Sequence, residues 1–274
     1  MLYFINVFSD GGDIFNLFRY ITFRAGGAFF TALCFGFIFG QPLINFLKKK
    51  QKNGQPIRPD GPEHHQILKA GTPTMGGVLI LGAMLTGSIL WARLDNVYVW
   101  VVLLVTIGFG LLGFVDDYKK VINRDSKGLS KSIRLLTGLL ISLIASTLTM
   151  SVHSENLSGF IAFPIFKGAL FYLGWFFIPF AMLVIVGSAN AVNLTDGLDG
   201  LAVMPVMIAG GALGIIAYAV GRVDFSEYLD VHYVSGTGEI LIIVSARASA
   251  LSRAAIVFPV SGVSSESHTR KTLK

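Results

Sequence analysis

The stretch Asn190-Ala-Val-Asn-Leu-Thr-Asp-Gly-Leu-Asp-Gly-Leu201 lies between two long apolar runs of this sequence. It places two carboxylates, Asp196 and Asp199, at the boundary of segments that are otherwise almost uncharged. Charge at a membrane boundary is costly, so ionisable residues there are by default candidates for a functional site. The stretch therefore marks both the end of a membrane-spanning segment and a candidate site.

The composition is that of an integral membrane protein. Of the 274 residues, 53% are hydrophobic and 14% are charged, with a mean hydropathy of +0.66; soluble domains carry about 25% charged residues. A spanning helix needs about 20 mostly apolar residues. Six runs are long enough: 25–46, 74–92, 97–115, 135–153, 168–190 and 198–221. A seventh run begins near Ile240 and is cut short by Arg247.

This pattern predicts an all-α fold: a polytopic membrane helical bundle with six complete transmembrane helices and a partial seventh. The net charge of +6 lies in the connections between apolar runs. Basic residues in that position set topology or meet anionic lipid and phosphate. We therefore expect membrane lipids, and no nucleic acid, as partners.

Lysine and arginine gather in two connections. Six basic residues lie in 48–69 and six in 119–134, whereas the connections between and after them carry one each. An excess of Lys and Arg marks the cytoplasmic side. We therefore expect the N-terminus outside, and these two segments and the loop near residue 193 inside, so that the polar motifs share the cytoplasmic face.

Asp116 and Asp117 end the third apolar run. Two adjacent carboxylates at the negative end of a helix dipole need a positive partner. Lys119 and Lys120 are within reach, and a divalent cation is the stronger candidate, because Mg²⁺ is typically held by one or two carboxylates plus substrate phosphates. We predict Asp116 and Asp117 as a metal site; a solvated pair at the start of a loop is the alternative.

The opening stretch, Asn190 to Leu201, carries polar groups of two kinds. Asp196 and Asp199 are three residues apart and share one face of a helix, and a helix start there favours an anion such as phosphate. Asn190 and Asn193 offer paired donors and acceptors that can bind the edge of a base or sugar. A polar capping loop is the alternative interpretation.

A weaker motif, Gly71-Thr-Pro-Thr-Met-Gly-Gly77, opens the second apolar run. Its glycines suit close helix packing. Lys69, just before it, could meet a phosphate or could simply set topology, and the two readings stay open at this point.

Three motifs together resemble a known family. Thr72-Pro-Thr-Met-Gly-Gly77, Gly113-Phe-Val-Asp-Asp-Tyr118 and the opening stretch are similar to those of the phospho-N-acetylmuramoyl-pentapeptide transferases. These are polyprenyl-phosphate N-acetylhexosamine-1-phosphate transferases of the bacterial plasma membrane. The resemblance runs from the N-terminus to about residue 246.

The resemblance implies an activity. UDP-N-acetylmuramoyl-pentapeptide would donate its phospho-sugar to undecaprenyl phosphate on the cytoplasmic face, giving UMP and lipid I of peptidoglycan synthesis, with Mg²⁺ as cofactor and a homodimer as a possible assembly. It also implies roles. Catalytic residues would be Asp116, Asp117 and Asp199; substrate-binding residues would be Lys69, Lys120, Asn190, Asn193 and Asp196.

The sequence departs from the family pattern near its end. Residues 1–246 would form the membrane transferase domain, incomplete relative to the family, and 247–274 a non-family tail that we expect to be disordered. The family's later Asp, in a Gly-Asp segment, and its His triplet do not occur. The resemblance therefore leaves open whether the chain as written is active, is truncated or frameshifted, or is an inactive remnant.

Two rival functions stay open. The first is a UDP-N-acetylglucosamine-1-phosphate polyprenyl transferase, although these versions of the motifs resemble the muramoyl branch more than the N-acetylglucosamine branch. The second is a non-enzymatic transporter or lipid carrier, for which broken helices at mid-membrane would be expected. Polar groups at span ends on one face favour an enzyme working at the membrane surface.

Overall fold

The computed structural model describes residues 1–51, 75–123, 128–152, 157–162, 170–195 and 202–257, with the side chains of 253–257 excepted. Within these ranges the chain is almost entirely helical, which confirms the predicted all-α class. The long helices are α1 (Ile21–Lys50), α3 (Gly77–Trp91), α4 (Val97–Asn123), α5 (Lys131–Val152), α6 (Phe177–Thr195), α7 (Val203–Val220) and α9 (Ile240–Val257).

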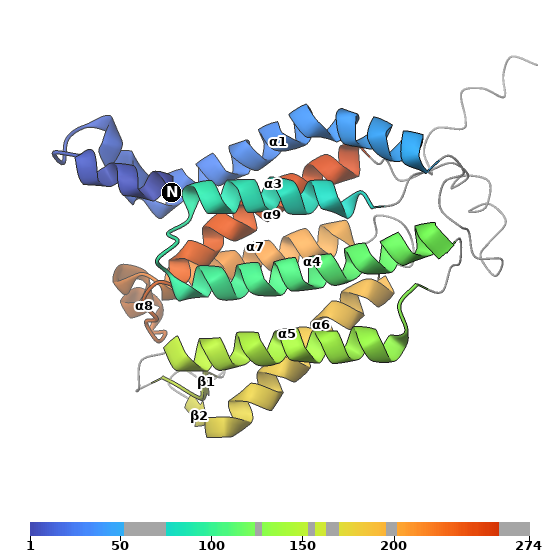
Figure 1. Ribbon diagram of the computed structural model, residues 1–274. Helices are drawn as coiled ribbons and strands as arrows, with labels where there is room; N and C mark the ends of the chain where they lie inside the picture. The colour runs from blue at the N-terminus through green and yellow to red at the C-terminus, as the bar shows by residue number, and fades with distance from the viewer. Residues whose placement is uncertain (52–74, 124–127, 153–156, 163–169, 196–201, 258–274) are drawn as a thin grey trace, which may run out of the picture.

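Short elements lie at one end of the bundle (Figure 1). The strands β1 and β2 pair antiparallel as a small hairpin. The short elements are η1 (Leu2–Phe8), η2 (Ile14–Arg19), β1 (Phe160–Ala162), β2 (Leu170–Tyr172), η3 (Gly174–Phe176), α8 (Val223–Leu229) and η4 (Thr237–Glu239).

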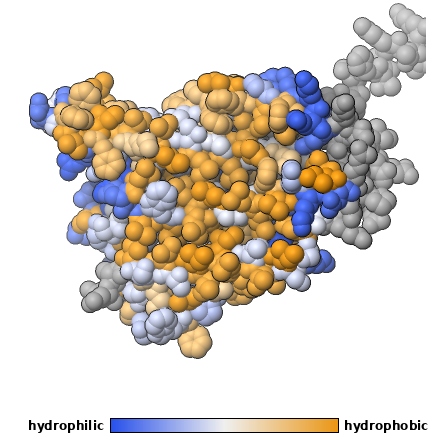
Figure 2. Space-filling model, viewed as in Figure 1, coloured by the Kyte–Doolittle hydropathy of each residue, from blue (hydrophilic) through white to orange (hydrophobic). Residues whose placement is uncertain are grey.

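Helix length and hydropathy fit a membrane-spanning bundle. In the described part of the chain, five helical segments are long and apolar enough to cross a bilayer, and Gly77–Trp91 is a shorter apolar helix. Figure 2 shows the consequence: an apolar band covers the middle of the bundle, and hydrophilic residues gather at its two ends. Large apolar side chains such as Phe37, Leu136 and Leu183 are exposed on helix surfaces, as expected where lipid replaces water.

Small residues set the tightest packing. Helix α9 packs against α1, α3 and α7, and Ala28 and Ala32 of α1 are fully buried beside it. Gly87 of α3 lies so close to α1 that a Cβ there would be 2.8 Å from the carbonyl oxygen of Ala28 and 3.1 Å from the Cβ of Ala246. Close approach at small residues is the usual basis of helix association in lipid.

Replacing Gly87 by alanine is therefore expected to destabilise the protein by about 1–3 kcal/mol, the usual cost of overpacking. Gly26 of α1 is a matched control, because nothing lies within 4 Å of a Cβ placed there; its alanine variant should be neutral or more stable. Thermal unfolding of both variants in detergent would compare them. Equal midpoints would show that the α1–α3 contact tolerates a methyl group.

The last helix corrects one expectation. The seventh run was predicted to stop at Arg247, with a disordered segment after it, but α9 continues to Val257. The reason is packing: Ala246, Ser249 and Ala250 are buried, and these small side chains give α9 a continuous contact face that a hydropathy average does not register. Residues 258–274 of the predicted tail lie outside the described residues.

Candidate active site at the Asp116 end of the bundle

The long helices alternate in direction along the chain (Figure 1). The C-terminal ends of α1, α4 and α6 and the N-terminal ends of α3, α5 and α7 therefore lie at the same end of the bundle. This end, called here the Asp116 end, carries Asp116 and Asp117 on α4 and Asn190 and Asn193 on α6. The predicted meeting of these two motifs at one end agrees with the fold. Asp196, Asp199 and Lys69 lie outside the described residues.

The helix geometry around Asp116 differs from expectation. Asp116 and Asp117 were predicted at the C-terminal end of a span, but α4 continues two turns further, to Asn123. The negative end of its dipole is thus displaced from the acid pair. Part of the reason is that Lys120, four residues after Asp116, forms an i,i+4 ion pair with it, which favours continued helix.

Asp116 is buried and already surrounded by positive partners. Its Oδ2 lies 2.6 Å from Nζ of Lys120, and its Oδ1 lies 2.9 Å from Nη2 of Arg134 on α5. The backbone N–H of Leu129 also donates to Oδ1, at 2.7 Å. With only 6% of the residue exposed, the carboxylate is neutralised by contacts from α4, α5 and the turn between them.

The turn that supplies this N–H requires glycine. Gly128 has a φ of +59° and sits so close to Asp116 that a Cβ would be 2.5 Å from Oδ1. A positive φ is readily adopted only by glycine. The Gly128-Leu129-Ser130 turn is therefore shaped around the Asp116 carboxylate.

Asp117 lies beside this cluster and is more exposed. Its side chain is 33% exposed, and Oδ1 is 3.4 Å from Nζ of Lys120. Lys120 thus bridges the two carboxylates, closer to Asp116. The predicted pairing of the acids with a lysine is present, and Lys120 rather than Lys119 makes the contacts described here.

The α6 side of this end is polar and open. Asn190 and Asn193 are both exposed. The Asn190 amide donates from Nδ2 to the carbonyl oxygen of Val186 at 2.8 Å, and Thr195 donates back to Ala191 at 2.9 Å. Both side chains thus donate to carbonyl oxygens of their own helix. The amide oxygen of Asn190 takes no part in the bond to Val186.

The fit to a metal ion differs between the two acids. Mg²⁺ is typically held by one or two carboxylates together with phosphate oxygens and water, so a pair of acids is the right type of donor. Asp117 is accessible enough to bind a cation. At Oδ2 of Asp116 a cation would meet the ammonium group of Lys120, 2.6 Å away. Among the residues that the structure describes, no group of three or more His, Cys, Asp or Glu is placed to hold a metal on its own.

Sequence reasoning missed Arg134 and the Gly128-Leu129 turn. Arg134 was counted only as a basic residue that sets topology. The signal that could have found it is the spacing: a charged residue in the first turn of α5 must face the end of α4 if the connection is short.

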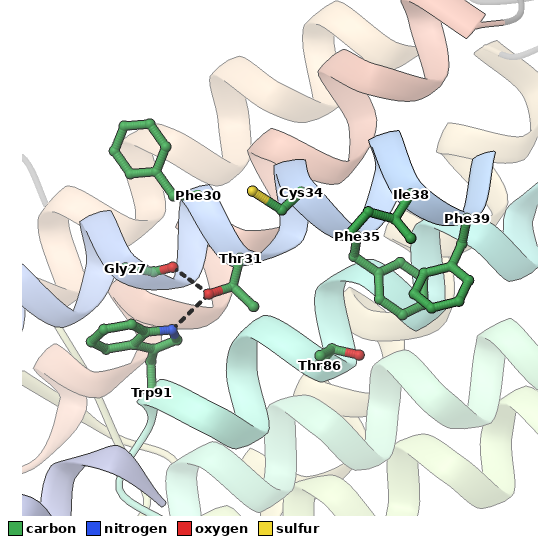
Figure 3. A pocket seen from close by; sticks show the side chains of 9 residues that line it. All are labelled: Gly27, Phe30, Thr31, Cys34, Phe35, Ile38, Phe39, Thr86 and Trp91. Atoms are coloured by element: carbon green, nitrogen blue, oxygen red, sulfur yellow. Dashed lines mark hydrogen bonds between the residues drawn. The ribbon is translucent and has the colours of Figure 1, made fainter. Parts of the chain in front are cut away.

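An apolar groove lies elsewhere in the bundle. A groove of about 420 Å³ opens between α1 and α3, and Figure 3 shows its lining, with the indole of Trp91 pointing at the Thr31 hydroxyl. Trp91 Nε1 donates to Thr31 at 2.9 Å, and Thr31 donates to the carbonyl oxygen of Gly27 at 2.8 Å. The lining carries no charged side chain. The groove can therefore make apolar contacts, whereas the charged groups of the candidate site lie at the Asp116 end.

A membrane-spanning helical bundle that gathers carboxylates, a lysine and carboxamides at one end suits an enzyme that transfers a charged group at the membrane surface. The family model described as glycosyl transferase family 4 matches residues 99–257, and the model of phospho-N-acetylmuramoyl-pentapeptide-transferase signature 1 matches residues 69–81.

Curated relatives make the assignment more specific. A phospho-N-acetylmuramoyl-pentapeptide-transferase of Ruegeria sp. (strain TM1040) is 64% identical over 246 residues, which are 90% of this chain and 68% of the relative. The proteins of the same name from Dinoroseobacter shibae and Ruegeria pomeroyi are 64% and 63% identical over the same shares. The chain belongs to the phospho-N-acetylmuramoyl-pentapeptide-transferase family of membrane phospho-sugar transferases.

Proposed function

We propose that this chain transfers the phospho-N-acetylmuramoyl-pentapeptide group of UDP-N-acetylmuramoyl-pentapeptide to undecaprenyl phosphate, giving lipid I and UMP. The observation that carries the proposal is the 64% identity to a transferase of that name over 246 residues. The charged Asp116 end supports it independently, because a polar cluster at one end of an apolar bundle suits a lipid phosphate and a water-soluble nucleotide that meet at the membrane surface.

The transfer is a phosphoryl transfer. A phosphate oxygen of undecaprenyl phosphate attacks the phosphorus that carries the sugar, and the bond from that phosphorus to the oxygen of UMP breaks. UMP leaves with the electron pair of that bond. Catalysis of this type rests mainly on positioning and on neutralising charge. A phosphate monoester, with a second pKa near about 6, is largely dianionic at neutral pH and needs no base to become a nucleophile.

Apart from Lys69, the proposed site residues form two groups, one on α4 and one in the stretch from Asn190. Asp117 and Lys120, with Asp116 beside them, are proposed for the lipid-phosphate and metal part of the site. The stretch from Asn190 is proposed for the nucleotide-sugar part, with Asp199 as a catalytic residue. The proposed nucleotide-sugar ligands are Asn190, Asn193 and Asp196, and Lys69 is proposed for a substrate phosphate.

Mg²⁺ is the proposed cofactor. When bound, it supplies positive charge to the phosphate oxygens that become more negative during transfer. The described part of the chain offers the Asp117 carboxylate as a ligand, and substrate phosphates and water would complete the coordination.

The membrane orientation is also a proposal. Lys48, Lys49 and Lys50 end α1 at the Asp116 end of the bundle, which the distribution of basic residues predicts to be cytoplasmic. The N-terminus would then be outside, membrane lipids would cover the apolar band, and any homodimer would form within the bilayer.

Single-cysteine labelling would test this orientation. In a Cys34→Ser background, a cysteine at position 125 is expected to react with a membrane-impermeant maleimide only after cell lysis, because it lies in a predicted cytoplasmic segment. A cysteine replacing Asp95, exposed at the other end of the bundle, is expected to react in intact cells. Reaction of position 125 in intact cells would invert the proposed orientation.

Donor comparison in detergent would test the reaction. Purified protein with undecaprenyl phosphate and Mg²⁺ should release UMP from UDP-N-acetylmuramoyl-pentapeptide, and much faster than from UDP-N-acetylglucosamine. A reversed preference would identify the N-acetylglucosamine transferase alternative. Folded protein that releases UMP from neither donor would contradict the proposed function.

A further inference from the structure

We propose that Arg134 is a positioning residue that holds Asp116 as a fixed anion for Lys120, so that Asp116 orients the site and does not bind the metal. The proposal rests on the proposed function, since it divides roles within that site. It assigns different roles to two adjacent acids and a role to an arginine on a different helix.

The contacts of Asp116 carry the first step. A carboxylate has about four lone-pair positions. Arg134 and the Leu129 N–H occupy two directions on Oδ1, and Lys120 lies 2.6 Å from Oδ2. A cation at Oδ2 would stand against the ammonium group of Lys120, and like charges at that distance repel. Metal binding by Asp116 would therefore require Lys120 to move.

The contacts of Asp116 continue through Lys120 to Asp117. Lys120 reaches from Oδ2 of Asp116 to Oδ1 of Asp117, at 3.4 Å. Arg134, Asp116, Lys120 and Asp117 thus form a continuous chain of opposite charges from α5 across the end of α4. The position of the Lys120 ammonium beside Asp117 depends on where Asp116 is held.

Arginine is well suited to position 134. Arg134 belongs to the first turns of α5, and its side chain is 37% exposed while that of Asp116 is 9% exposed. The guanidinium therefore reaches from the membrane surface onto a buried oxygen, a role for which a planar, permanently charged group is suited. A lysine at this position could still place one N–H donor near Oδ1.

The first experiment needs no turnover. The rate at which an amine-acylating reagent modifies Lys120 is measured by mass spectrometry in folded protein. Asp116→Asn should raise that rate, because the ammonium loses its carboxylate partner, and Arg134→Met should change it, because the carboxylate is no longer held in place. Lys131→Met is the matched control, since it removes a cation from the same exposed turn without touching Asp116, and it should leave the rate unchanged. Unchanged Lys120 reactivity in Arg134→Met would overturn the proposal.

The second experiment separates positioning from metal binding. Arg134→Met should lower kcat by about 10²-fold, the typical loss when a reacting group is misplaced by about 1 Å, while the half-saturating Mg²⁺ concentration stays at the wild-type value. Arg134→Lys should recover most of kcat. Asp116→Asn should likewise keep the Mg²⁺ dependence, whereas Asp117→Asn should shift it to higher concentration.

Two outcomes of the second experiment would overturn the proposal. The first is that the half-saturating Mg²⁺ concentration shifts equally in Asp116→Asn and Asp117→Asn. The second is an unchanged kcat per folded Arg134→Met molecule, whether or not its Tm is lower. Failure of the proposed function gives a different result, namely a wild-type protein that releases no UMP. In that case the Lys120 reactivities still decide whether Arg134 positions Asp116.

Discussion

Replacing Glu239 by alanine is expected to lower the free energy of unfolding by about 3–5 kcal/mol, because it leaves a buried arginine without its counter-charge. Glu239 lies in η4, at the opposite end of the bundle from Asp116, and accepts two hydrogen bonds from Arg24 of α1, at 2.6 and 2.7 Å. It also accepts a hydrogen bond from the backbone N–H of Arg93, at 3.0 Å. The Arg24 and Glu239 side chains are 1% and 5% exposed.

This ion pair ties together segments far apart in the chain. Arg24 also donates to the carbonyl oxygen of Trp91 at 3.2 Å, and the ring of Tyr3 lies 4.8 Å from the guanidinium carbons of both Arg24 and Arg93. The N-terminal segment, α1, the α3–α4 connection and the start of α9 therefore meet at one cluster. Loss of Glu239 should loosen all four.

Equilibrium unfolding in mixed detergent would measure the effect. The matched control is Asp95→Ala, which removes an acid from an exposed pair with Arg93 (2.7 Å, side chains 40% and 48% exposed); such pairs contribute about 0–1 kcal/mol. The hydrogen bond from Arg93 lowers the pKa of Asp95, so this small contribution is present above its unfolded pKa and lost as the pH falls through the folded value. Equal effects of the two variants would show that the Glu239 pair is not stabilising.

Removing the negative charge of Asp117 or Asp199 is expected to reduce phospho-sugar transfer by at least about 10²-fold, a loss typical when one group of a charge-stabilising site is removed. Asp117 is the more accessible acid of the Asp116 end, and Asp199 belongs to the motif proposed for the nucleotide sugar. Carboxylate-to-carboxamide changes keep the shape, so both variants should insert and purify.

The control for these variants is Asp224→Asn. Asp224 is an exposed acid of α8, paired with Arg222 at 2.8 Å, at the end of the bundle away from Asp116. The rate of UMP release, normalised to folded protein, should be unchanged in this control. Near-wild-type rates in Asp117→Asn and Asp199→Asn as well would reduce both acids to structural caps.

The helices were largely predictable from sequence because lipid imposes length and hydropathy on each segment. The run 97–115 predicted where α4 begins, but not that it would continue to Asn123, since residues beyond the apolar core are held helical by ion pairs rather than by hydropathy. The continuation of α9 past Arg247 was missed for a related reason: buried Ala246 and Ala250 stabilise it through contacts with other helices.

The site was predictable by residue type more than by geometry. Asp116 and Asp117 were found from the placement of charge next to an apolar run. The position of Arg134 in the first turn of α5 indicates which end of α4 it lies near, but the geometry of its contact with Asp116 depends on how α5 turns back along α4. The Arg24–Glu239 pair joins residues 215 positions apart, and nothing local in either sequence segment indicates a partner.

The central claim is that phospho-sugar transfer takes place at the Asp116 end of the bundle. A sided assay would test it most directly: protein reconstituted in vesicles with undecaprenyl phosphate and Mg²⁺, UDP-N-acetylmuramoyl-pentapeptide added only outside, and orientation measured by maleimide labelling of cysteines at 125 or 95. The rate of UMP release should rise in proportion to the fraction of molecules labelled at 125 from outside. A rate that instead follows labelling at 95, or no release in either orientation, would contradict it.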